Sequence, residues 1–485
     1  MTITRLNEIR KQRIKKLAEL KKLGIDPYPS YFEKKQTCAE ATLLLGKKAQ
    51  TAGRIAAIRG HGKIMFLDLV DSSGKIQVWL QKQKLRNYEI TKFLDIGDFL
   101  GVSGKVVKTK SGERTIDASE FILLSKAIRS LPDKWHGLKD IEERYRKRYL
   151  DLILNPETKK VFETRSKILS NIREFLDDQD FLEVETPVLQ PMYGGASARP
   201  FITHHLALDN DFYLRISNEL YLKRLIVGGF DKVYEVSRDF RNEGIGKFHN
   251  PEFTQVEFYW AYADYEKLMK FTEVMLITVI KAVNGSLKVK RLNKVYDFKR
   301  PWQRLSFSEA LKEYTGINME KITTEADLKR EIKNKKVEVN LQKAVGLGAI
   351  YEQLYKTYVR PNLEGPLFLI DYPAEMIALA KRKDGDPKKI ASFQLLVGGT
   401  ELLKAYNELN DPIDQKNRWL EEEKKAKLGV EETERLDEDY IEALEYGMPP
   451  TAGWGMGIDR LTLFLTDQPT LKDVILFPTL KPKNR

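Results

Sequence analysis

The chain contains a single cysteine, Cys38, among 485 residues. One thiol cannot form a disulfide within the chain, and its isolation excludes a zinc site built from cysteines. No apolar run approaches the ~18 residues that a membrane-spanning helix needs. Residues 1–8 lack the apolar core of a secretory signal. These absences predict a soluble cytoplasmic protein that makes no contact with a membrane.

The remaining composition is that of a globular protein with several domains. Apolar residues make up 42% of the 56.2 kDa chain and aromatic residues 10%. This excludes wholesale disorder and suggests roughly two to four domains. The net charge of +12 favours a polyanionic partner without identifying it.

The positive charge is concentrated in a basic N-terminal extension, residues 1–50. Its first 23 residues carry eight Lys and Arg side chains against two Glu, which is half of the whole surplus. Apolar residues recur there near the helical period and predict a helix that ends at Gly24. This helix is either a solvated surface helix or a basic arm for nucleic acid.

Residues 51–126 show short strands separated by turns. Three strands, a helix and two further strands are expected at 54–59, 63–70, 75–80, 85–94, 99–108 and 115–124. This order is typical of the OB-fold barrel, whose middle strands bind single-stranded nucleic acid. Phe66 could stack on a base or belong to the barrel core. The candidate binding residues are Arg54, Phe66, Gln77 and Glu120.

The rest of the chain indicates a linker and one large α+β domain. Residues 127–142 form the linker, with Trp135 as a packing anchor. Helices dominate from Glu143 to Asp178, and strands at irregular spacing follow. Irregular spacing favours an antiparallel or mixed sheet with helices over a doubly wound sheet. A charged helical stretch at 306–361 is expected to be an insertion.

Three groups of residues in this domain could carry chemistry. Arg241 and Phe253 flank a polar loop between two strands, where a bidentate cation and a flat ring suit a nucleotide. A glycine-rich stretch leads into an apolar helix whose first turn carries Arg460, which suits an anion. Glu401 and Glu408 could bind a hard cation or an ammonium group. Each group could instead be structural: an ion-pair ladder, a tight turn or a solvated charge.

In this order, the three groups resemble the signature motifs of class II aminoacyl-tRNA synthetases. Motif 1 would lie at about 168–189, motif 2 at about 233–259 and motif 3 at about 451–466. Within that class, five phrases resemble the lysyl-tRNA synthetases: LPDKWHGL (131–138), RYRKRYLDL (144–152), GGASARPFITHH (194–205), ELYLKRLIVGGF (219–230) and PPTAG (449–453). The resemblance implies an OB-fold barrel that binds the anticodon, followed by a catalytic domain (143–485). That domain would be an antiparallel sheet flanked by helices, dimerising through motif 1.

The resemblance also implies a reaction and a role for each site residue. Lysine and ATP would form lysyl-adenylate, and the lysyl group would pass to tRNA(Lys). Arg241 and Arg460 would be catalytic, with Mg²⁺ as cofactor. The nucleotide would be bound by Arg241, Glu243, His249, Asn250, Phe253, Glu401, Gly457 and Arg460. Lysine would be bound by Gly195, Glu219, Glu257, Tyr259, Lys404, Tyr406 and Glu408.

Some positions depart from the family pattern. The metal ligands would be Glu401 and Gln394, although a second glutamate is usual where Gln394 stands. Lys404 replaces an asparagine that meets the substrate carboxylate, and it could partly replace the charge lost from the metal site. Phe248 stands where the motif 2 loop often carries arginine, and Ile377 with the following alanine stands where Ser-Pro is frequent.

Three other functions remain open on the sequence. A related enzyme could place lysine on a protein, but such relatives lack the OB-fold domain. A catalytically inactive tRNA-binding protein would be expected to have lost Arg241 or Arg460, and both are present. A synthetase for another amino acid is disfavoured by Glu257 and Glu408, because buried carboxylates are costly beside a neutral substrate.

Overall fold

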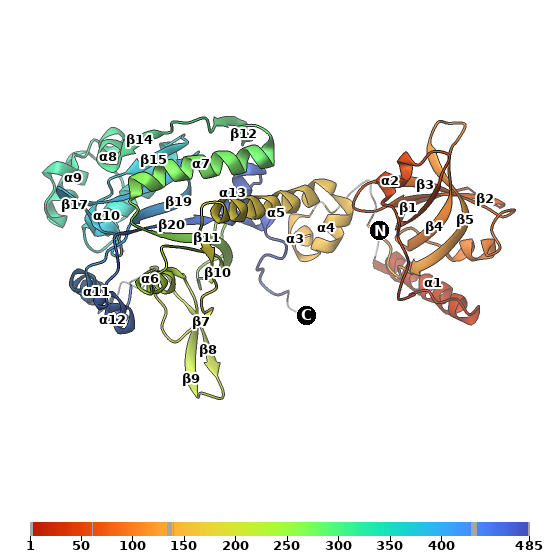
Figure 1. Ribbon diagram of the computed structural model, residues 1–485, viewed down its shortest axis with the longest axis horizontal. Coiled ribbons are helices and arrows are strands. Elements are labelled where there is room, and N and C mark those ends of the chain that lie inside the picture. The colour runs from red at the N-terminus through yellow and green to blue at the C-terminus, as the bar shows by residue number, and fades with distance from the viewer. Residues whose placement is uncertain are drawn as a thin grey trace. The chain divides into compact units, whose positions relative to one another are not determined.

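The computed structural model describes residues 3–60, 62–132, 138, 140–342, 344–427 and 434–483 (Figure 1). The chain divides into two compact units, Met1–Lys139 and Asp140–Arg485. Trp135, the expected anchor of the linker, lies outside the described residues. Within the described part of the chain, no helix has the length and apolar character needed to cross a membrane.

The basic N-terminal segment forms helix α1 (Ile3–Lys22), as predicted, and one of its faces packs against its own unit. Leu20 is fully buried. The buried Arg13 guanidinium donates hydrogen bonds to three backbone carbonyl oxygens at 2.9–3.0 Å. Lys16 pairs with Asp95 at 2.7 Å. Two of the predicted cations therefore attach the helix to its unit, so a wholly solvated helix is the wrong interpretation for this face.

The first unit is a closed five-stranded barrel, which confirms the OB-fold prediction. The strand order is β1-β2-β3-β5-β4, and β1 pairs with β4 to close it. The expected helix at 85–94 is a shorter 3-10 segment, η1 (Tyr88–Phe93). The other elements are α2 (Cys38–Leu43), β1 (Lys48–Arg59), β2 (Ile64–Val70), β3 (Lys75–Gln81), β4 (Phe99–Lys108) and β5 (Arg114–Ser125).

An eight-stranded sheet organises the second unit, in the order β14-β15-β18-β19-β20-β11-β10-β6. The six strands from β15 to β10 are antiparallel, and the edge strands β14 and β6 pair in parallel. This agrees with the expected antiparallel or mixed sheet. The strands are β6 (Leu182–Glu183), β10 (Lys232–Phe240), β11 (Glu252–Ala261), β14 (Gln303–Ser306), β15 (Leu367–Ile370), β18 (Ser392–Val397), β19 (Thr400–Asn407) and β20 (Thr451–Gly457).

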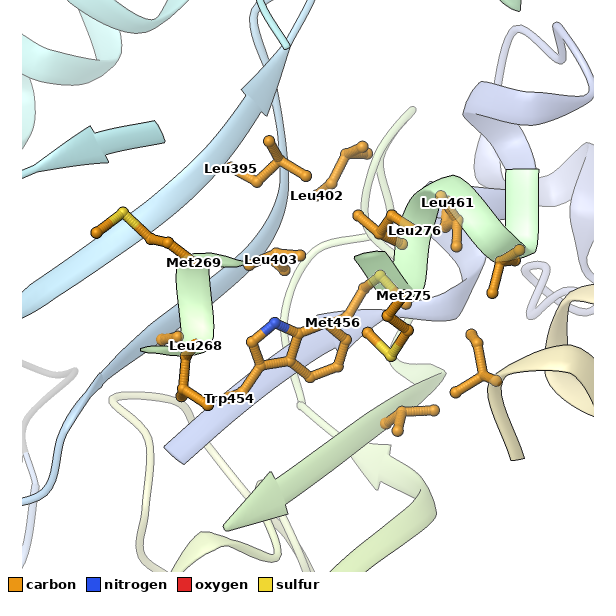
Figure 2. Packing of buried hydrophobic residues seen from close by; sticks show 14 of the residues in the cluster. Leu268, Met269, Met275, Leu276, Leu395, Leu402, Leu403, Trp454, Met456 and Leu461 are labelled. Atoms are coloured by element: carbon orange, nitrogen blue, oxygen red, sulfur yellow. The ribbon is translucent and has the colours of Figure 1, made fainter. Parts of the chain in front are cut away.

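Helices α5 (Pro156–Asp177), α7 (Tyr265–Asn284) and α13 (Ile458–Leu465) cover one face of this sheet and bury its core (Figure 1). Figure 2 shows Trp454 of β20 among leucine and methionine side chains from α7 and the neighbouring strands. Its ring stacks on Phe258 with centroids 4.8 Å apart, and its Nε1 donates to Thr272 Oγ1 at 3.0 Å. With one face thus filled, the alternate residues of each strand point to the other face.

The stretch expected to be helical at 306–361 contains several helices, and they share a buried core with the sheet. Phe307 and Leu354 belong to one buried cluster with Leu367 and Leu369 of β15. The helices expected between Glu143 and Asp178 are α3, α4 and α5. The remaining elements are α3 (Ile141–Arg146), α4 (Arg148–Leu154), β7 (Leu189–Gln190), β8 (Phe201–His205), β9 (Asn210–Leu214), α6 (Glu219–Val227), β12 (Lys288–Arg291), β13 (Lys294–Asp297), α8 (Phe307–Thr315), η2 (Met319–Lys321), α9 (Glu325–Asn334), α10 (Leu347–Leu354), η3 (Tyr355–Val359), η4 (Arg360–Asn362), η5 (Ala374–Met376), β16 (Arg382–Lys383), β17 (Asp386–Ile390), α11 (Pro412–Lys427), α12 (Glu438–Glu445) and α14 (Leu471–Val474).

Candidate active site

A cavity of about 530 Å³ lies on the face of the sheet opposite the core helices. Along β11, Val256 and Phe258 enter the core, whereas Glu257 and Tyr259 face the cavity. The structure brings together every residue predicted to bind nucleotide or amino acid. The cavity is lined by Gly195, Glu219, Arg241, Glu243, His249, Asn250, Phe253, Glu257, Tyr259, Glu401, Lys404, Tyr406, Glu408, Gly457 and Arg460.

One end of the cavity combines an arginine with an aromatic ring. Arg241 follows β10, and Phe253 lies near the start of β11, the strand paired with β10. The Arg241 guanidinium lies 5.0 Å from the centroid of the Phe253 ring. Its Nε donates to the carbonyl oxygen of Ile216 at 3.3 Å, which limits its movement. A fixed cation beside a flat ring suits a phosphate attached to a planar base.

Arg460 supplies a second cation to the end of the cavity where Arg241 and Phe253 lie, here named the nucleotide end after the ligand predicted for it. It lies in the first turn of α13, with one guanidinium nitrogen 3.7 Å from Glu401 Oε1. Burial and the nearby Arg460 charge lower the pKa of His249, so its ring is neutral at pH 7. A neutral imidazole can hydrogen-bond a nucleotide there without adding another positive charge.

The start of α13 is locked to the neighbouring strand by Asp459. Its Oδ2 accepts the backbone N–H of Thr254 on β11 at 3.1 Å, and its Oδ1 lies 2.5 Å from the Arg165 guanidinium of α5. These two contacts set the position of the helix turn that carries Arg460. A backbone hydrogen bond and a buried ion pair therefore fix the spacing between the predicted motif 2 and motif 3 residues.

The opposite end of the cavity is acidic. Glu257 is 9% exposed; it accepts a hydrogen bond from Gln255 Nε2 at 2.6 Å and a longer one from the Tyr259 hydroxyl at 3.4 Å. Burial raises the pKa of Glu257 well above its usual range, and Asp239 and Glu219 add to the rise. An arriving ammonium group would pair with this carboxylate and favour its ionised form.

A buried lysine joins two other carboxylates of this acidic end. Lys223 of α6 lies 2.6 Å from Glu219 Oε1, one turn earlier on the helix, and forms an ion pair with Glu408. The Tyr406 hydroxyl donates to Glu219 Oε1 at 2.8 Å. Burial alone would lower the pKa of Lys223, but Glu219 and Glu408 outweigh it and hold that pKa well above its usual value.

Of the glycines expected at the start of the helix that carries Arg460, Gly453 lies inside β20, where it makes room for the Glu408 carboxylate. A Cβ on Gly453 would overlap the Glu408 carboxylate and lie 2.6 Å from Tyr259 Cε1. A Cβ on Gly455 would lie 3.4 Å from Glu257 Cγ, at ordinary contact distance. Gly453 therefore serves the acidic end of the cavity, whereas Gly457 caps α13, the helix that carries Arg460, as the sequence led us to expect.

The carboxylates at the nucleotide end fit a weakly held metal ion. Glu401 and Glu352 both line the cavity. In the described part of the chain, no three His, Cys, Asp or Glu side chains form a group that could hold a metal by themselves. Mg²⁺ usually takes one or two carboxylates together with water and substrate phosphates, so this donor set fits a magnesium–nucleotide complex.

The structure does not bring Gln394, the second predicted metal ligand, into the cavity lining of the described residues. Its Oε1 accepts a hydrogen bond from the Tyr355 hydroxyl at 2.7 Å, which uses one of the two lone pairs of that oxygen. Lys404, its partner on β19, lies 5.7 Å from the centroid of the Tyr406 ring. Gln394, which departs from the family pattern, is thus hydrogen-bonded to Tyr355 and does not line the cavity of the described residues.

Glu434 and Lys223 are among the lining or supporting residues that escaped the sequence analysis. Glu434 lines the cavity and accepts a hydrogen bond from Trp419 Nε1 at 2.9 Å. Burial raises the pKa of Glu434 to about 7, and Glu219 adds to the rise. Lys223 could have been found, because Glu219 and Lys223 are spaced to meet on a helix. Glu434 follows α11 at irregular spacing, and no sequence signal marks it.

The predicted residues of the barrel fall into two groups. Phe66 and Trp79 stack on neighbouring strands, with centroids 5.6 Å apart and planes 14° apart. Gln77, two residues before Trp79, is buried and donates to Glu113 Oε2 at 2.9 Å. Phe66 lies outside the buried barrel cluster, so it is not a core residue. Trp79 was missed, although its spacing from Gln77 places both on one face of the strand.

Arg54 and Glu120 are placed differently. On β1, Arg54 pairs opposite Val70, whereas Phe66 pairs opposite Arg59 toward the other end of the strand pair. The Arg54 guanidinium lies 4.3 Å from the Phe99 ring centroid and donates to a backbone carbonyl at 3.0 Å. Glu120 is exposed on β5. Arg54 is thus engaged within the barrel, while Glu120 is open to solvent.

Comparison with known proteins gives the same assignment for both units. Residues 140–481 match the family described as tRNA synthetases class II (D, K and N), and residues 49–124 match the OB-fold nucleic acid binding domain. The Lysine--tRNA ligase of Carboxydothermus hydrogenoformans is 48% identical over 485 residues, which cover 99% of both chains. The Lysine--tRNA ligase of Pelotomaculum thermopropionicum is 47% identical, over 99% of this chain and 96% of its own. That of Clostridium novyi is 48% identical, over 98% of this chain and 95% of its own. The chain therefore belongs to the lysine–tRNA ligase family of class II tRNA synthetases.

Proposed function

We propose that this protein ligates L-lysine to tRNA(Lys) in two steps, through a lysyl-adenylate. The observation that carries the proposal is one cavity with two arginines toward one end and three buried carboxylates toward the other. Arg241 and Arg460 lie at the nucleotide end, and the buried Glu219, Glu257 and Glu408 lie at the other. A cationic amino acid and a polyanionic nucleotide would each meet the complementary charge there.

In the first step, an oxygen of the lysine carboxylate would attack the α-phosphorus of ATP, and pyrophosphate would leave. Two anions must approach each other, so Arg241 between them would neutralise their repulsion. Arg460 would hold the departing phosphates, and the adenine would stack on Phe253. Mg²⁺ would neutralise further phosphate charge when bound, with Glu401 as the residue that holds it.

In the second step, a hydroxyl of the tRNA 3′-terminal ribose would attack the lysyl carbonyl carbon, and AMP would leave. The barrel would bind the anticodon, with Phe66 and Gln77 as contacts and Arg54 and Glu120 as further candidates. The stacked ring of Phe66 supports this role, since aromatic faces bind unpaired bases. The exposed cations of α1 would add phosphate contacts that do not depend on sequence.

We further propose that the protein acts in the cytoplasm as a homodimer. The low cysteine content supports a reducing compartment. Exposed apolar side chains in and just after the predicted motif 1, Val188, Leu189 and Met192, support a dimer interface there, since they are 39–47% exposed in the single chain.

Amino-acid-dependent exchange between ATP and pyrophosphate tests the first step without tRNA. We expect exchange with lysine alone among the twenty amino acids. Glu257→Gln should raise the lysine KM about 100-fold, because it removes one partner of a buried charge pair, a loss of ~3 kcal/mol. Glu252→Gln, on the same strand but ion-paired with Arg238 and outside the described cavity lining, is the matched control. Exchange with no amino acid, even after tRNA is added, would overturn the proposal.

A further inference from the structure

Lys223 is a buried cation inside a pocket proposed to select a cation. Its side chain is 0% exposed, and the surrounding carboxylates belong to separate parts of the chain. Glu219 lies one turn earlier on α6, while Glu408 follows β19. The Tyr406 ring, whose centroid is 5.9 Å from Lys223 Nζ, covers a further side. Nothing in the proposed reaction uses this ammonium group directly.

The contacts of Lys223 determine where two substrate-binding groups stand. Glu219 Oε1 receives both Lys223 Nζ at 2.6 Å and the Tyr406 hydroxyl at 2.8 Å, so its position is fixed from two directions. Glu408 is held to the same ammonium group, and the missing Cβ of Gly453 leaves room for its carboxylate. Glu257 instead accepts hydrogen bonds from Gln255 and Tyr259.

These contacts also set the charge that the pocket offers. Glu219, Glu257 and Glu408 carry three negative charges when ionised, and Lys223 neutralises one of them. Lys404 and Glu434 line the same cavity and, when both are ionised, their opposite charges cancel. The remaining two match the α-ammonium and ε-ammonium groups of free lysine. A neutral amino acid would leave one of these buried charges without a partner, which is costly.

We propose that Lys223 is a positioning residue for lysine recognition, whose ammonium group holds Glu219 and Glu408 in place and adjusts the pocket charge to a substrate with two ammonium groups. This inference rests on the proposed function. It also explains the lysine on α6: an apolar side chain of similar length would fill the space but leave two buried carboxylates unpaired. Such carboxylates take up protons, so the pocket would lose the charge that binds lysine.

Lys223→Met tests this in the full-length chain by pyrophosphate exchange. We expect the KM for lysine to rise at least tenfold while the KM for ATP changes less than twofold. Lys416→Met removes a lysine of the same type from an exposed ion pair with Glu438, and it should change neither value. A folded Lys223→Met protein whose lysine KM stays within twofold of the unchanged chain would overturn the proposal.

The pH dependence of the lysine KM separates positioning from a purely structural role. The titratable groups that face Lys223 are Glu219 on its own helix, Tyr406 and Glu408 at β19, and Tyr440 on α12; Glu257 and Glu434 line the same cavity. Without Lys223, the acid limb of the plot of log(1/KM) for lysine should move up by at least one pH unit. A structural role alone would lower the melting temperature and leave this limb in place, which would contradict the proposal.

If Lys223→Met alone does not fold, the double variant Lys223→Met/Glu408→Gln removes both buried charges together, which buried pairs usually tolerate. Its lysine KM should exceed that of Glu408→Gln by at least tenfold, because Glu219 has still lost its partner. Equal values in the two variants would refute the role of Lys223. Failure of the proposed function itself would appear differently, as absent lysine-dependent exchange in the unchanged chain.

Discussion

Gly453→Ala is the substitution for which the structure gives the sharpest expectation. Gly453 lies in the interior of β20, between the acidic end of the cavity and the buried sheet. An added Cβ would overlap the Glu408 carboxylate and approach Tyr259 Cε1 and Cδ1 to 2.6 and 3.0 Å. The Tyr259 ring is buried and cannot move aside freely. The Glu408 side chain would have to leave its place beside Lys223.

The size of the effect follows from the overlap. Adding a methyl group to a tightly packed site costs about 1–3 kcal/mol, and here the displaced group is a proposed lysine ligand. If most of that cost falls on lysine binding, the lysine KM rises roughly 10- to 100-fold, since each 1.4 kcal/mol is a factor of ten. The nucleotide end of the cavity is untouched, so the KM for ATP should stay within about twofold.

Pyrophosphate exchange with separate titrations of lysine and ATP measures both quantities. Gly455→Ala is the matched control, because its Cβ would meet Glu257 at an ordinary 3.4 Å on the same strand. It should raise the lysine KM less than threefold. A Gly453→Ala protein that binds lysine as well as the Gly455→Ala protein would refute the view that Gly453 accommodates the Glu408 carboxylate. Equal losses for lysine and ATP would refute it as well, since they would indicate general damage to the sheet.

Three other expectations concern stability and tRNA. The carboxyl of Glu434 has its pKa raised to about 7 by burial, whereas in the unfolded chain it ionises near 4.3. Glu434 therefore lowers the free energy of unfolding progressively as the pH rises from 4.3 to 7. Glu434→Gln should raise the melting temperature at pH 8 but hardly at pH 5. An equal rise at both pH values would contradict this. Trp79→Ala should raise the tRNA KM about tenfold through lost stacking and leave tRNA-independent exchange unchanged; an effect on exchange would indicate misfolding. The tRNA KM should rise with salt concentration. In a plot of log KM for tRNA against log salt concentration, Lys11→Ala/Lys15→Ala should lower the slope by about one to two. An unchanged slope would exclude a contact between these α1 cations and the tRNA phosphates.

Local patterns were sufficient for the parts of the site that lie on adjacent strands. Arg241 and Phe253 could be placed together because they flank the loop of a hairpin, whose two strands lie side by side whatever surrounds them. The observed register pairs β10 directly with β11. Motif 3 then lies beside motif 2, since β20 pairs with β11 along its whole length. The alternation of polar and apolar residues on β11 decided which side chains face the cavity.

The sequence could not reveal contacts between segments that are far apart in the chain. Arg13 was counted among the cations of a basic helix, but it is buried against backbone carbonyls of the barrel unit. Lys223 meets Glu408 only because α6 packs beside the end of β19. Glu434 reaches the cavity from the connection between α11 and α12. In each case tertiary packing determines the partner, and the periodicity of apolar residues along the sequence carries no information about it.

The charge arrangement also explains which competitors such a pocket rejects strongly and which it rejects weakly. A neutral amino acid of similar length would leave one buried carboxylate without a cation, which is costly because little solvent reaches Glu257. A diamino acid shorter by one methylene keeps both ammonium groups, and a missing methylene is worth only about 1–3 kcal/mol. If lysine binds as proposed, discrimination against neutral side chains is a matter of charge count, to which Lys223 contributes. Discrimination against other diamino acids would then depend on how far apart the carboxylates on α6 and β11 lie.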